Sequence, residues 1–166
     1  MKHSIWMAAA VAVLALSPLA QAEEFPGGMV CRSGPLNGSQ GYVNDMNFVG
    51  DANQTQVYCP LKRITCSSFP CTKTAVITAM DNNSLTTADA SVSCRLITYL
   101  KGGAYYATQG SWSTLSATAG THGTLSLSVT MSSFSPNDGY LVAECLLGKQ
   151  DGAGNRSDIS WVSAND

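Results

Sequence analysis

The clearest pattern in the chain is the alternation of apolar and polar residues in "TLSLSVTM", Thr124–Met131. A period of two places Leu125, Leu127 and Val129 on one face of an extended strand and the hydroxyl side chains on the other. No window after the first 22 residues places apolar residues at helical spacing. We expect eight further strands, in Gly41–Phe48, Thr55–Leu61, Thr74–Met80, Asp89–Leu100, Ala104–Gln109, Ser111–Ala117, Tyr140–Leu147 and Asp158–Ser163.

Turn-forming stretches separate these segments, among them "PLNGSQG", "DNNS", "KGG", "SPNDG" and "DGAGN". They are rich in residues that accept a positive φ or hydrogen-bond to their own backbone. We expect a tight hairpin at Lys101–Gly103 and a loose start at "EEFPGG", Glu23–Gly28. Short strands joined by frequent turns predict an all-β fold. The expected architecture is an antiparallel β-sandwich of about eight or nine strands, with the jelly roll as one candidate topology.

The first 22 residues have the composition of a secretory signal peptide. Lys2 gives a basic start, Met7–Leu16 is apolar, and the stretch ends in Ala20-Gln21-Ala22. The apolar part is shorter than the ~20 residues that a membrane span needs. We therefore expect cleavage after Ala22, a single β-sandwich domain over residues 23–166, no integral membrane segment, and a secreted or periplasmic location.

The charge of the exported part argues against a nucleic-acid partner. Without Lys2 this part carries eight basic and eleven acidic residues, and its only adjacent basic pair is Lys62-Arg63. A protein that binds nucleic acid or an anionic membrane surface needs a basic stripe. We expect neither partner.

All six cysteines follow the signal peptide, and an even number in an exported chain predicts three disulfides. Alternation places Cys59, Cys94 and Cys145 on apolar faces. We expect Cys94 to bridge Cys145, between strands that are neighbours or face each other across the core. Cys66 and Cys71 enclose only "SSFP" and are expected to close a local loop, which leaves Cys31 for Cys59; fifteen pairings are formally possible. A zinc or redox site is the alternative, but the chain has no Cys-x-x-Cys motif.

Short motifs around four of the cysteines resemble those of a broad group of small secreted bacterial proteins. The motifs are Cys31 near the exported start, "VYCPLKR", "VSCRL", "GYLVAECLL" and a closing "SDISWV". They follow a layout of Cys, Cys-Pro-Leu, Cys-x-Leu and Cys-x-Leu. The resemblance implies a disulfide-held β-sandwich without an assigned activity. Cys66 and Cys71 depart from the plain four-cysteine layout.

Two residues are candidates for the catalytic group of a small secreted hydrolase. His122 lies in the glycine-flanked "AGTHGT", where we expect a surface loop, and a catalytic histidine needs a nucleophile and an orienting group beside it. Glu144 lies inside a strand, opposite the cysteine face. We expect an exposed glutamate on a solvated sheet face rather than a catalytic acid or base, because a glycosidase needs a second carboxylate that the sequence does not place. The sequence therefore favours a protein without catalytic activity and without a cofactor.

The segment "DGAGNRSD" is a candidate calcium loop. Asp151, Asn155 and Asp158 supply the oxygen ligands that calcium prefers. The segment lacks the glycine spacing and the closing glutamate of an EF-hand. A plain hairpin loop is the simpler interpretation, and we expect no metal there.

The candidate ligand-binding residues are Tyr105, Tyr106 and Trp112, in "GGAYYATQGSW" beside the expected hairpin. Exposed aromatic rings with polar neighbours suit stacking on sugar rings, and the alternative is that the rings pack in the core. Alternation places Tyr105 and Tyr106 on opposite faces, so only one can join Trp112. We therefore expect a secreted, non-catalytic binding or structural module at the cell surface, envelope or matrix. Its expected partner is a polysaccharide, as for a carbohydrate-binding module, or another surface protein.

Overall fold

The structure is a computed structural model of the chain. It describes residues 23–34, 41–44, 47–51, 53–82, 91–100, 106–116, 119–132 and 139–165. The expected signal peptide, residues 1–22, and the expected turn at Lys101–Gly103 lie outside these ranges. Within them, no helix has both the length and the apolar character needed to cross a bilayer.

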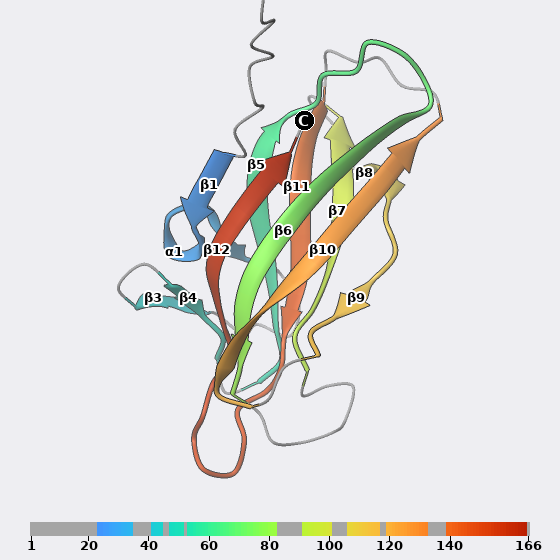
Figure 1. Cartoon of the computed structure of the whole chain (residues 1–166). Helices are drawn as coiled ribbons and strands as arrows, with labels where there is room; N and C mark the ends of the chain where they lie inside the picture. Colours follow the sequence, from blue (N-terminus) through green and yellow to red (C-terminus); the bar gives the residue numbers. More distant parts are fainter. Residues whose placement is uncertain are drawn as a thin grey trace, which may run out of the picture.

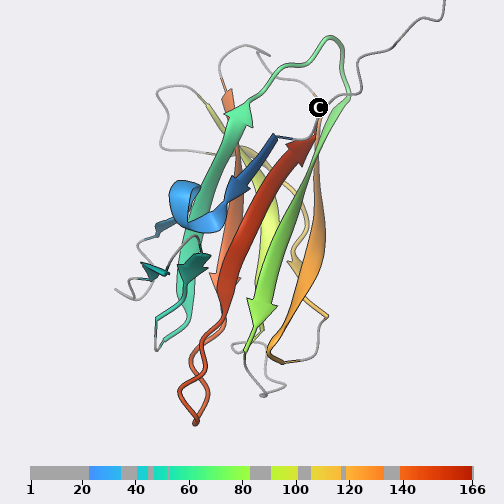
Figure 2. The ribbon, with the colours of Figure 1, turned by 60° about the vertical axis from the view of Figure 1, so that its left-hand side comes forward.

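The fold is an antiparallel β-sandwich of two sheets, as the alternation predicts (Figures 1 and 2). Sheet A has the order β10 (Thr121–Met131), β6 (Cys71–Asp81), β12 (Asp158–Asn165), β4 (Asn47–Val49) and β3 (Tyr42–Asn44), and β1 (Glu23–Pro26) also pairs with β12. Sheet B has the order β2 (Arg32–Ser33), β5 (Thr55–Arg63), β11 (Gly139–Leu147), β7 (Ser93–Leu100) and β8 (Tyr106–Gln109), and β9 (Ser113–Thr114) pairs with β7. A single turn of helix, α1 (Gly27–Val30), follows β1.

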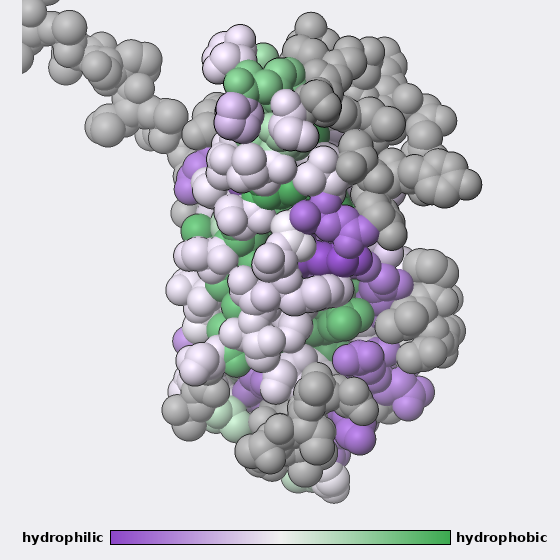
Figure 3. Space-filling model, turned by 90° about the vertical axis from the view of Figure 1, so that its right-hand side faces the viewer, coloured by the Kyte–Doolittle hydropathy of each residue, from purple (hydrophilic) through white to green (hydrophobic). Residues whose placement is uncertain are grey.

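The core lies between the sheets, where alternate residues of the long strands meet. Ile77 in β6, Leu127 in β10 and Leu96 in β7 are among these buried side chains. The outward-facing residues of β10 are exposed serines and threonines, beginning with Thr124 and Ser126. Figure 3, which looks at the side that carries β9 and β10, shows mostly pale, weakly hydrophilic surface with small apolar patches, and strongly hydrophilic side chains gathered right of centre. The period of two thus separates core from surface.

Three disulfides join the predicted pairs, Cys31 to Cys59, Cys66 to Cys71 and Cys94 to Cys145. Of the two arrangements that the sequence allows for Cys94 and Cys145, the structure has the neighbouring one. The two residues lie directly opposite each other on β7 and β11, with their Cα atoms 4.1 Å apart. Both are fully buried, so this disulfide lies on the core side of sheet B.

Two expectations about the first part of the chain are wrong. Gly41–Phe48 is a pair of short antiparallel strands, β3 and β4, in which Asn44 lies opposite Asn47, so the chain reverses direction between them. The segment "EEFPGG" is not loose, because β1 pairs with β12 from Glu23 opposite Ala164 to Pro26 opposite Trp161. The backbone groups of β12 provide partners for a segment that has no strand pattern of its own.

Candidate functional site

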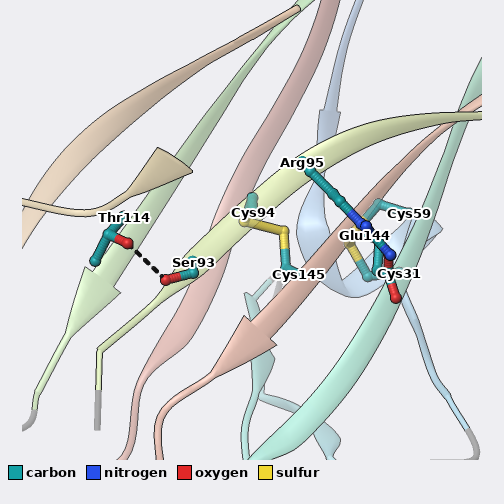
Figure 4. Close-up of a disulfide and its surroundings, with 8 residues drawn as sticks. All are labelled: Cys31, Cys59, Ser93, Cys94, Arg95, Thr114, Glu144 and Cys145. Atoms are coloured by element: carbon teal, nitrogen blue, oxygen red, sulfur yellow. Dashed lines mark hydrogen bonds and ion pairs between the residues drawn. A yellow bond between two sulfur atoms is a disulfide. The ribbon is translucent and has the colours of Figure 1, made fainter. Parts of the chain in front are cut away.

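The outer face of sheet B carries a row of large polar side chains. Tyr58 in β5, Glu144 in β11 and Arg95 in β7 lie opposite one another in the registers of the three strands. This row is next to the disulfide, because Arg95 follows Cys94 and Glu144 precedes Cys145 (Figure 4). Neighbouring residues of a strand point to opposite faces, so the disulfide points into the core and the polar row points away from it.

Glu144 is the centre of a hydrogen-bonded network and is not exposed as we expected. Its residue is only 4% exposed. Arg95 Nε donates to Oε2 at 2.6 Å, Gln56 Nε2 donates to Oε1 at 2.6 Å, and the Tyr58 hydroxyl donates to Oε1 at 3.3 Å. These longer side chains from the neighbouring strands cover the carboxylate, and they satisfy both of its oxygens.

Arg95 connects this network to Trp112. Its guanidinium carbon lies 4.6 Å from the centroid of the indole ring, which is a cation–π contact. Its Nη1 also donates to Gln109 Oε1 at the end of β8. Trp112 is 40% exposed, so the core-packing alternative is wrong for this residue. We call Trp112, Arg95, Gln109, Glu144 and Tyr58 the Trp112 face.

The other two predicted aromatic residues cannot be placed on this face. Tyr105 lies outside the described residues, and Tyr106 is the first residue of β8 but its side chain is not among those described.

Towards the start of β11, the outer side of sheet B carries a buried apolar pair. Val142 and Ile97 lie opposite each other, two residues along from Glu144 and Arg95. Both are buried, yet neither belongs to the core cluster between the sheets. Two residues further along, Tyr140 lies opposite Tyr99 and is 48% exposed. The outer side of sheet B therefore has an exposed aromatic residue at two levels, Trp112 and Tyr140.

The Tyr58 hydroxyl should ionise only at strongly alkaline pH. Burial and, to a smaller extent, the negative charge of Glu144 together raise the pKa of Tyr58 to about 12. The folded protein therefore keeps this proton where an unfolded chain loses it, so we expect the free energy of unfolding to fall as the pH rises from about 10 to about 12. An ultraviolet titration of tyrosinate, compared between wild type and Tyr58→Phe, measures the pH range over which the Tyr58 hydroxyl ionises. A Tyr58 that titrates with the exposed tyrosines contradicts it.

The two candidate catalytic residues do not share a site. His122 is in strand β10 of sheet A, opposite Met80, rather than in the loop that we expected. The Thr121–Asp81 pairing extends this strand beyond the alternating segment, to the end of β6. Glu144 lies on the outer face of sheet B. The residues opposite Glu144 are Tyr58 and Arg95, neither of which is a second carboxylate.

The candidate calcium ligands make hydrogen bonds within the protein instead. Asp151 closes its own loop, because its carboxylate accepts hydrogen bonds from the backbone N–H groups of Ala153 and Asn155 and from Asn155 Nδ2. The Asn155 hydrogen bonds lower the pKa of Asp151. Asp158 is buried in sheet A and accepts a hydrogen bond from Ser160 Oγ at 3.0 Å. Among the described residues, no group of three or more histidine, cysteine, aspartate or glutamate side chains is placed to hold a metal ion.

Comparisons with known proteins place the chain near no established family. The sequence matches no protein-family profile and no curated protein. Several solved structures follow a similar course, and three of them are as follows. A carbohydrate-binding module from Cellvibrio mixtus lichenase 5A, solved with cellotriose, is 12% identical, with a TM-score of 0.45 over 87% of this chain and 96% of that one.

The second structure, the xylan-binding module CBM15, is 15% identical, with a TM-score of 0.46 over 88% of this chain and 96% of that one. The third, the Stig cyclase Fisc from Fischerella sp. TAU, is 10% identical, with a TM-score of 0.42 over 92% of this chain and 80% of that one. The ligands named in these structures belong to those proteins.

Proposed function

We propose that the protein is a secreted, non-catalytic module that binds polysaccharide through the Trp112 face, at the cell surface, envelope or matrix. The observation that carries the proposal is an exposed indole whose neighbour, Arg95, is held in place by a buried carboxylate. The three disulfides fit an oxidising compartment. We also propose membership in the group of small secreted bacterial proteins that the cysteine motifs resemble.

The chemistry of the face suits a sugar chain. A sugar ring presents apolar C–H groups on its faces and hydroxyl groups around its edge, so it pairs with an aromatic ring flanked by hydrogen-bonding groups. Trp112 supplies the ring surface, and Arg95 and Gln109 supply the polar edge. Because Glu144 holds the guanidinium, little side-chain freedom remains to be lost when a ligand binds.

The same geometry supports a binding role over glycoside hydrolysis. A glycosidase needs an acid and a second carboxylate across the scissile bond. Glu144 is engaged by Arg95, Gln56 and Tyr58 instead. Its role in the proposal is therefore to position Arg95 beside Trp112.

Depletion of the protein from solution by insoluble polysaccharides tests the proposal. Wild type is expected to be retained by at least one polysaccharide, and Trp112→Ala is expected to weaken that retention by about 1 to 3 kcal/mol, on the scale of aromatic stacking on nucleic-acid bases. The matched control is Trp161→Ala, because Trp161 is 45% exposed but lies on the outer face of sheet A. Equal retention of all three proteins contradicts polysaccharide binding at the Trp112 face. It would leave a structural role, or another surface protein as the partner.

A further inference from the structure

A cavity of about 460 Å³ opens on the other side of the sandwich, on the outer face of sheet A. Its volume lies within the roughly 300 to 1,000 Å³ of pockets that hold small molecules. Part of the lining comes from the segment between β11 and β12, which extends below the sheets as a loop in Figure 1. None of its lining residues belongs to the Trp112 face.

Three neighbouring strands contribute the first part of the lining. Asp158 in β12 lies opposite Met80 in β6 and opposite Val49 in β4, and all three side chains line the cavity. Asp158 is only 5% exposed although it does not point into the core between the sheets. Burial raises the pKa of this carboxyl, and the hydrogen bonds from Ser160 and Asn47 and the neighbouring His122 act in the opposite direction. A buried acidic group thus lies between two apolar side chains.

The loop side of the lining consists of polar groups that are held in position. The Asn155 side chain donates to Asp151 Oδ2 at 2.8 Å, and the Asn82 side chain donates to the backbone carbonyl of Arg156 at 2.7 Å. Gln150 and Arg156 complete this side. Because the loop is closed by Asp151 and tied to Asn82, the cavity exists before any ligand arrives.

The charges and hydrogen-bonding groups of the lining decide between ligand classes. The lining carries charges of both signs, on Arg156 and Asp158, and Asp51 lies 3.7 Å from the Arg156 guanidinium, so the lining has no strong preference for a cation or an anion. The amides and the two charged lining groups supply both donors and acceptors, which is what a hydroxyl group needs because it donates and accepts. The side chains of Met80 and Val49 supply an apolar surface for the carbon skeleton.

We propose that this cavity binds one neutral sugar unit, either a free monosaccharide or the end of a glycan. The carboxylate of Asp158 accepts hydrogen bonds from the sugar hydroxyls, and the amides of Asn82, Gln150 and Asn155 surround them. The cavity and the Trp112 face lie on different sheets, so binding at one does not require the other.

The test is a calorimetric or NMR titration of the purified protein with neutral monosaccharides and their methyl glycosides. At least one sugar is expected to bind to the wild type with a dissociation constant on the order of millimolar, as expected for so small a ligand. Asp158→Asn keeps the side-chain shape, removes the charge, and should weaken binding about tenfold or more. Gln150→Ala is a second variant that leaves the strands intact, and it should weaken binding several-fold. Circular dichroism checks that each variant is folded.

The control separates this site from the proposed polysaccharide face. Trp112→Ala is expected to leave monosaccharide binding unchanged, even if it abolishes retention by polysaccharide. A methyl glycoside that binds as well as the free sugar indicates the end of a glycan, and loss of binding on methylation indicates a free sugar. The proposal is overturned if no neutral sugar binds to the wild type at millimolar concentrations. It is also overturned if folded Asp158→Asn and Gln150→Ala bind as the wild type does, or if only calcium or an acidic sugar binds.

Discussion

Replacing Cys94 and Cys145 together by alanine is expected to lower the free energy of unfolding by about 4 kcal/mol. The disulfide joins residues 51 positions apart, and a cross-link over so long a loop removes much of the conformational entropy of the unfolded chain. Removal of the disulfide should also affect the Trp112 face, because the disulfide joins the two strands one residue away from the Arg95 and Glu144 pair. Chemical denaturation of the double variant measures the effect.

The matched control is the Cys66→Ala, Cys71→Ala double variant. This disulfide joins residues only 5 positions apart, so the same entropy argument gives a loss of about 2 kcal/mol. It is not part of either sheet pairing that carries the Trp112 face, and polysaccharide retention should be unchanged. Equal destabilisation by the two double variants would show that loop closure is not how the long disulfide stabilises the fold.

Replacing Glu144 by alanine is expected to cost about 3 kcal/mol of stability. The ion pair has little exposure, with side-chain accessibilities of 18% for Arg95 and 6% for Glu144. Removal of one partner of such a pair leaves the other charge poorly solvated and uncompensated. Gln56 and Tyr58 also lose their acceptor. Because Arg95 is then free to leave the indole, polysaccharide retention should fall together with stability.

Two further variants separate these effects. Glu144→Gln keeps the size of the side chain and one acceptor oxygen, so it should be less destabilising than Glu144→Ala. Asp51→Asn breaks the more exposed contact with Arg156, where the ionic atoms are 3.7 Å apart, and should cost no more than about 1 kcal/mol. A Glu144→Ala protein as stable as Asp51→Asn would mean that the buried pair does not hold this face together.

The pairing of Arg95 with Glu144 in the Trp112 face can be inferred from the sequence. Once Cys94 and Cys145 are paired on antiparallel neighbours, the order Cys94-Arg95 on one strand and Glu144-Cys145 on the other places Arg95 opposite Glu144. The same register shows that Glu144 has long side chains on both sides. An exposed glutamate was therefore the wrong expectation, because strand alternation indicates which face a residue occupies but not what its neighbours cover.

Other features depend on contacts that no local pattern specifies. Trp112 lies between β8 and β9 in a stretch without periodicity, so its contact with Arg95 follows only from the fold. Asp158 was both a candidate calcium ligand and the first residue of an expected strand. The structure confirms the start of the strand, but the cavity beside it requires β4, β6 and the loop before β12 together. β1 forms because β12 has backbone groups to pair, not because Glu23–Pro26 has a strand pattern.

The most direct test of the central claim uses the two tryptophans of the expected exported chain, because Trp112 and Trp161 lie on opposite outer faces of the sandwich. Each indole N–H gives its own signal in a nitrogen-labelled sample, and Trp112→Ala and Trp161→Ala assign the two signals. The titrant is a soluble oligosaccharide from the polysaccharide that retains the protein best. The Trp112 signal is expected to shift with saturation while the Trp161 signal stays in place. Saturable binding that shifts only Trp161, or neither signal, would contradict binding at the Trp112 face.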